Sequence, residues 1–202
     1  MSARFASELG FDPRCDERFV TKAPPLRALI EAIRVHGLEP VIVACVPHEV
    51  ERWFRAPPQP GEWVPAIDSH YLLCALDRVV GPAGVRAVAR TATLGLARTM
   101  RPLIECMLRL LDATPHAFFA RSAEILGSQV EGVHFEHLEL ERTRGGLLVR
   151  YDYLLDPPDC AFVYWLGVVE TTIDLCGKRL LDATVLRSEL ERDTANVIVA
   201  WR

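Results

Sequence analysis

The feature that most constrains the fold of this chain is a change in the spacing of its apolar residues near residue 128. Before that point, apolar side chains recur every three or four positions, which is typical of amphipathic helices. After it they alternate, most clearly in the run Leu147, Val149, Tyr151 and Tyr153, which is typical of half-buried strands. A single change of spacing predicts an α+β fold, because helices and strands segregated along a chain pack as separate layers.

Proline and glycine mark the expected helix ends in the first part. Pro24 and Pro25 begin a helix, because proline is tolerated in a first turn, and Gly37 ends it. The expected helices span residues 24–36, 47–54, 64–80, 84–100, 101–111 and 114–127. The spans 84–100 and 101–111 fit either two helices or one long helix with a break near Gly95 or Pro102. The segment 41–45 fits either a strand or a short buried helix.

The second part is expected to form a sheet with one helix. Alternation predicts strands at 133–142, 147–156, 179–186 and 196–201, with a hairpin turn at 143–146 and a helix that begins after Pro157 and Pro158. This order predicts an antiparallel ββαββ sheet, and residues 18–21 fit a short edge strand. We expect a single domain over 1–202, with an N-terminal extension (1–23), a helical part (24–127) packed on the sheet, and a ββαββ part (128–202).

Composition excludes several classes of protein. The formal charge is −4, which argues against a dedicated nucleic-acid binder. No apolar run approaches the roughly 20 residues of a membrane-spanning helix, and the N-terminus lacks the apolar segment of a secretory signal. A cytoplasmic protein is therefore expected. The six cysteines form no CxxC pair, so we expect them to be reduced thiols.

No motif predicts catalysis or metal binding. His134, Glu136 and His137 form the most suggestive cluster, but alternation places only His134 and Glu136 on one face, which is too few ligands for a closed zinc site. The other histidines, including His70 and His116, are isolated in sequence. There is no Gly-x-Ser-x-Gly elbow and no phosphate-binding loop. We therefore predict no catalytic residue and no metal ligand, and an enzyme is the less favoured alternative.

Aromatic residues are the best candidates for a ligand pocket, because aromatic side chains between a sheet and a helix often line apolar cavities. Simple core packing is the alternative for each of them. The candidates for ligand binding are Trp63, Tyr71, Tyr151, Tyr153 and Trp165, and Trp53 is a further candidate for the pocket wall.

The second half of the chain resembles a known ligand-binding fold. The residues that carry this resemblance are Gly132 before the hairpin, Tyr151-Asp152-Tyr153, the helix around 167–177 and a final strand ending in Trp201. The fold is shared by four-vinyl-reductase-type domains, TRAPP trafficking subunits and heme nitric-oxide-binding domains. With the Glu62-Trp63-Val64-Pro65 motif and the 19–29 segment, the whole chain is most similar to an uncharacterised family abundant in myxobacteria.

The resemblance also shows two departures. Heme-binding members carry a Tyr-x-Ser-x-Arg motif for the propionates, and residues 151–155 do not match it. Four-vinyl-reductase-type members often keep cysteines near the last strand, whereas residues 193–196 contain none. The resemblance therefore leaves the cofactor unknown.

These observations favour a non-enzymatic sensory or adaptor module that binds a small apolar ligand or a protein partner. One alternative is a heme-binding, tetrapyrrole-binding or other cofactor-dependent protein, and another is a structural homodimer without a ligand. A homodimer through the helical half is expected because the apolar residues of 101–111 surround most of the helix axis. The resemblance adds that TRAPP subunits associate through helices.

Overall fold

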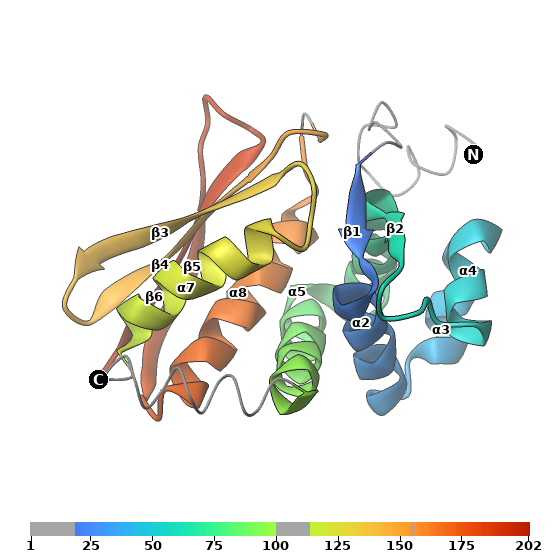
Figure 1. Ribbon diagram of the computed structural model, residues 1–202, viewed down its shortest axis with the longest axis horizontal. Helices are drawn as coiled ribbons and strands as arrows, with labels where there is room; N and C mark the ends of the chain where they lie inside the picture. Colours follow the sequence, from blue (N-terminus) through green and yellow to red (C-terminus); the bar gives the residue numbers. More distant parts are fainter. Residues whose placement is uncertain (1–18, 100–113, 155) are drawn as a thin grey trace.

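The computed structural model describes residues 19–99, 114–154 and 156–202. Within these residues, helices at one end of the molecule lie beside a four-stranded sheet that is covered on one face by two further helices (Figure 1). One connected cluster of buried apolar side chains runs through both parts. The predicted α+β class is confirmed. No helix in the described part of the chain is long and apolar enough to cross a membrane.

The described N-terminal part begins with a small sheet, whose first strand overlaps the edge strand expected at 18–21. Strand β1 (Val20–Lys22) pairs antiparallel with β2 (Trp63–Pro65), so that Thr21 lies opposite Val64. Between these strands lie α2 (Ala23–Val35), α3 (Glu39–Val43) and α4 (His48–Arg55). The two readings of residues 41–45 are thus resolved in favour of a short helix.

Helix α5 (Ala66–Thr99) joins the two parts and changes direction at Gly81. Gly81 has φ 67° and ψ −179°, a left-handed φ that glycine adopts without a steric penalty. Pro82 follows at once and is tolerated there because it begins a new helical segment. The expected end of a helix at Gly81 is therefore a kink between two helical segments.

The second part contains α7 (Pro115–Gly127), β3 (Val133–Glu141), β4 (Arg144–Tyr151), α8 (Asp159–Leu175), β5 (Leu180–Arg187) and β6 (Thr194–Trp201). The strands form an antiparallel sheet in the order β3-β4-β6-β5. Helices α7 and α8 cover one face of this sheet (Figure 1). The Thr114 side chain accepts a hydrogen bond from the Ala117 N–H, which is the predicted cap of α7.

Helices α5 and α8 make the most extensive helix–helix contact of the described chain. Gly167 of α8 permits this approach, because a Cβ atom there would lie 2.6 Å from the Arg86 carbonyl oxygen of α5. Beside it, the fully buried Glu170 accepts a hydrogen bond of 2.7 Å from Arg86 Nε. One turn further along, Arg90 Nη2 donates a hydrogen bond of 2.6 Å to Asp174 Oδ2. The two helices are therefore joined by close packing and by an ion-pair network.

Several expected boundaries were wrong. Residues 64 and 65 belong to β2, because they pair with β1, and α5 begins only at Ala66. Strand β4 begins at Arg144, so Gly145 and Gly146 lie in the sheet and not in the turn. A Cβ atom on Gly146 would lie 1.9 Å from the Val197 carbonyl oxygen, so close strand approach explains this glycine. The strand predicted through 156 ends at Tyr151, and the expected helix 101–111 lies outside the described residues.

Candidate functional site

One cavity of the described structure is lined mostly by buried and half-buried side chains and has a volume of about 200 Å³. It lies where the helical part meets the second part, and its lining comes from β1, α2, α5, α7, β3, β4, α8 and the segment before β3. The lining is mostly apolar, and none of the described lining residues is Asp, Glu, Lys or Arg. A cavity of this composition favours an apolar, uncharged occupant.

Aromatic side chains of β4 and α8 form one wall. Trp165 Nε1 donates a hydrogen bond of 2.7 Å to the Tyr151 hydroxyl, and the Trp165 ring packs edge-on against Phe135 with centroids 4.7 Å apart. Burial raises the pKa of Tyr151 well above its ordinary value and raises the pKa of Tyr164 to about 12. Both phenols, which are neutral at physiological pH even in water, therefore stay neutral at alkaline pH as well.

His70 is the most unusual side chain of the site. It lies on the first segment of α5, is 3% exposed and lines the cavity. Its Nε2 atom lies 2.8 Å from the Tyr153 hydroxyl, whereas Nδ1 has no hydrogen-bond partner among the described residues. Burial lowers the pKa of His70 to about 4, so its imidazole is neutral. An unpaired buried nitrogen costs about 1–3 kcal/mol, so a ligand or water on Nδ1 would stabilise the folded protein.

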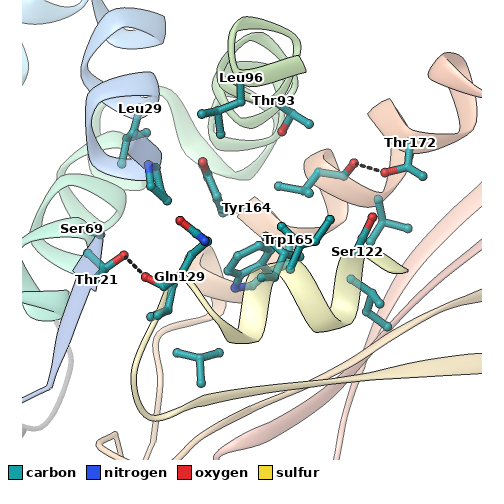
Figure 2. A pocket seen from close by; sticks show the side chains of 18 of the residues that line it. Thr21, Leu29, Ser69, Thr93, Leu96, Ser122, Gln129, Tyr164, Trp165 and Thr172 are labelled. Carbon is teal, nitrogen blue, oxygen red and sulfur yellow. Dashed lines mark hydrogen bonds between the residues drawn. The ribbon is translucent and has the colours of Figure 1, made fainter. Parts of the chain in front are cut away.

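Three threonine side chains of the lining form hydrogen bonds with backbone carbonyls of the protein. Thr21 Oγ1 donates to the Gln129 carbonyl at 3.2 Å, and Thr172 Oγ1 donates to the Val168 carbonyl at 3.2 Å (Figure 2). The Thr93 hydroxyl bonds the Ala89 carbonyl in the same way. Tyr164 extends from α8 toward the space between Leu29 and Leu96 (Figure 2). The three threonine hydroxyls of the lining therefore already have partners within the protein.

The structure separates the predicted ligand-binding residues into two groups. Tyr151, Tyr153 and Trp165 line the cavity together, and Tyr151 and Tyr153 also contact the His70 ring with centroids 5.2 and 5.7 Å away. Tyr71 is fully buried on α5 but is absent from the lining. Trp63 is 45% exposed beside Lys22, at the surface of β2. A role in ligand binding stays a prediction for all five of these residues.

The remaining candidates lie outside the cavity. Trp53 is buried in α4, where its Nε1 donates to Asp68 Oδ2 at 2.7 Å. His134 lies at the surface with Nε2 2.5 Å from Asp152 Oδ2. His137 instead faces α7, where its Nε2 lies 3.2 Å from His116 Nδ1. Among the residues that the structure describes, no three His, Cys, Asp or Glu side chains converge as a metal site would require.

Sequence reasoning missed His70 and Tyr164 as lining residues. His70 is isolated in the sequence, and its partner Tyr153 lies 83 residues away. The available signal was weak: His70 is a polar residue on the apolar side of a predicted helix, surrounded by Ile67, Tyr71 and Cys74. Such a residue must be paired, neutral or functional, because an unpaired buried charge is strongly unfavourable.

This chain resembles known proteins in its three-dimensional structure but not in its sequence. No protein-family model matches the chain, and no curated protein sequence matches it. Solved structures of H-NOX domains match over 90% of the chain. An oxygen-binding H-NOX domain related to soluble guanylate cyclases has a TM-score of 0.63 and 13% sequence identity, with 95% of that chain covered.

Two further H-NOX structures agree with this result. An unliganded Fe(II) form of a mutant H-NOX protein from K. algicida has a TM-score of 0.62 and 13% identity, with 96% of that chain covered. A structure from work on heme distortion in the H-NOX family has a TM-score of 0.62 and 11% identity, with 94% covered. Because the identities are low and the coverage is nearly complete, the likeness concerns the fold alone: this chain shares the fold of H-NOX domains.

Proposed function

We propose that this chain is a sensory domain that binds a small, uncharged and mostly apolar ligand in the cavity between its two parts. The observation that carries the proposal is the position of the cavity, which is lined at once by α2, both segments of α5, α7 and α8. A ligand there contacts elements of both parts, so its binding free energy can favour one arrangement of them over another. The H-NOX fold supports the sensory part of this proposal, because structures with this fold include an oxygen-binding domain and one described in terms of H-NOX activation. For the ligand itself, those neighbours favour the heme-binding alternative that is considered below.

The cavity volume narrows the class of ligand. A dry engineered cavity of about 150 Å³ accepts benzene, whereas drug-sized ligands occupy sites of roughly 300–1,000 Å³. The present cavity of about 200 Å³ is therefore matched to a molecule with one or two rings. Because the described lining has no charged side chain, an ionised ligand would lose its hydration without gaining a counter-ion.

The proposal is tested on protein purified from its own host. Mass spectrometry of the denatured protein extract should detect one small molecule in a near-stoichiometric amount. Ala97→Phe adds a ring from a residue that lines the cavity and should reduce this amount at least tenfold. Ala83→Phe, at an exposed position of the same helix, is the matched control and should retain the molecule. Equal amounts in the two variants, or no molecule in the wild type, would contradict the proposal.

A second candidate is a heme-binding or tetrapyrrole-binding domain, which the Fe(II) and heme-distortion structures among the relatives favour. His70 would offer an imidazole to iron, as histidine does in many heme proteins. The described lining, however, contains no Lys or Arg for the heme carboxylates, and a cavity of about 200 Å³ is small even for drug-sized ligands. The described residues thus do not fit a heme in this conformation.

An absorbance spectrum separates the two candidates without any assumption about a colourless ligand. If the chain takes a small uncharged ligand, the purified protein should show no Soret band, and added hemin should bind no better than it binds to Ala97→Phe. A stoichiometric Soret band that disappears in Ala97→Phe would replace the first candidate with the tetrapyrrole one.

A further inference from the structure

Among the described residues that line the cavity, His70 has a ring nitrogen that is buried and has no hydrogen-bond partner, and this nitrogen suggests what the ligand must carry. His70 is 3% exposed, it lines the cavity, and its Nδ1 has no partner among the described residues. The other ring nitrogen is already engaged by the Tyr153 hydroxyl at 2.8 Å. The ring is also held edge-on between Tyr151 and Tyr153. The imidazole is therefore fixed in position, with a single free hydrogen-bonding site.

The surroundings of His70 restrict the charge of that ligand. The rings that pack on it belong to tyrosines, which are neutral at physiological pH, and burial raises the pKa of Tyr151 further. None of the described residues around the cavity carries a formal charge. A hydroxyl group suits either tautomer of the imidazole, because it can donate to a bare Nδ1 or accept from a protonated one. A carboxylate would meet no cation there.

We propose that the cavity takes a small ring-sized molecule with one neutral hydroxyl or equivalent group, and that this group hydrogen-bonds to His70 Nδ1. This inference rests on the proposed function, since it assigns the polar contact of the same cavity. The Tyr153 contact makes His70 a positioned anchor, because the hydrogen bond on Nε2 fixes the orientation of the ring. The apolar wall then selects the ring, and Nδ1 selects the hydroxyl.

Phenol, toluene and benzoate are suitable probes, because they share one ring and differ in a single substituent. Their dissociation constants are measured by NMR titration of the amide signals of the full chain. Phenol and toluene should both bind, and benzoate should bind at least tenfold more weakly than phenol. In His70→Phe, the affinity for phenol relative to toluene should fall about tenfold, which is the effect of one hydrogen bond to a buried group.

Two further variants separate the anchor from a merely structural role. His70→Asn keeps a polar atom near the position of Nδ1 and should restore much of the preference for phenol. Thr171→Val removes a buried hydroxyl that bonds the Gly167 carbonyl outside the cavity lining, and it should leave the preference unchanged. In the wild type, phenol but not toluene should shift the ¹⁵N resonance of His70 Nδ1. This measurement uses no substituted protein, so it does not depend on whether a variant folds.

The outcomes distinguish the inference from the proposed function. If neither phenol nor toluene binds to the wild type, the proposed small-ligand cavity is wrong and the inference fails with it. If both bind but His70→Phe leaves their ratio unchanged and the Nδ1 resonance does not move, the anchor is overturned while the cavity proposal stands. Tighter binding of benzoate than of phenol would overturn the assignment of a neutral ligand.

Discussion

Burial determines the ionisation of the side chains that matter most for this site. Burial raises the pKa values of Tyr151 and Tyr164 further above that of an ordinary tyrosine, and it keeps His70 neutral because it disfavours the imidazolium form. Of these three, only His70 has an ordinary pKa near physiological pH, so it is the one whose burial affects stability under mild conditions.

We predict that the protein loses stability in the pH range in which His70 would titrate. The pKa of His70 is about 4 in the folded protein and 6.5 in an unstructured peptide, so the unfolded chain binds more protons between these values. The free energy of unfolding should therefore fall as the pH decreases from about 6.5 to 4, with a contribution of up to about 3 kcal/mol from His70. Urea unfolding of the wild type and His70→Asn at several pH values measures this contribution.

The variant should show a smaller dependence on pH over the same range, because it has no imidazole to protonate. Thr171→Val is the control: it changes a buried polar side chain that does not titrate, so it should keep the wild-type slope. Parallel pH profiles for the wild type and His70→Asn would refute the assignment.

At the scale of secondary-structure elements, the contact between α5 and α8 depends on one glycine. Gly167→Ala places a Cβ atom 2.6 Å from a backbone oxygen of α5 and 2.7 Å from Ala89 Cβ, and neither atom can move independently of its helix. Overpacking of this kind costs about 1–3 kcal/mol, which outweighs the gain of up to about 1 kcal/mol from replacing glycine in a helix. Differential scanning fluorimetry should show a melting temperature several degrees lower, by about 2–4 °C per kcal/mol.

Gly95→Ala is the matched control for this prediction. Gly95 lies in the second segment of α5, is exposed, and has no atom within 4 Å of an added Cβ. Only the helix propensity changes there, so the melting temperature should rise by roughly 2 °C. A lower melting temperature for Gly95→Ala, or a higher one for Gly167→Ala, would contradict the steric explanation.

At the scale of the whole molecule, the homodimer stays a prediction. It depends on residues 101–111, which lie outside the described residues and whose apolar side chains surround most of a helix axis in sequence. The chain has a mass of 22.6 kDa, so a dimer has a mass of 2 × 22.6 = 45.2 kDa. Light scattering after size exclusion at micromolar concentration should give the larger value. A mass of 22.6 kDa that persists on concentration would show that these residues are covered within one chain.

The sequence by itself determined the class of the fold and the type of most elements. Apolar spacing, proline, glycine and the cap at Thr114 act within a few residues, so α7 and the helix after Pro158 were predicted from local information. The same information identified Tyr151 and Trp165 as pocket candidates, because aromatic residues of a sheet and of the helix packed on it often line an apolar cavity, and both residues do line the cavity.

Tertiary structure decided the features that depend on contacts between distant residues. Residue 64 lies in a strand only because β1 lies beside it, and Gly146 lies in a strand because β6 approaches it closely. His70 and Tyr153 meet only after α5 and the end of β4 have packed together. Local patterns fix which side of an element is apolar, but the register and crossing of packed elements determine which side chains converge, and the cavity with its unpaired nitrogen is a product of that packing.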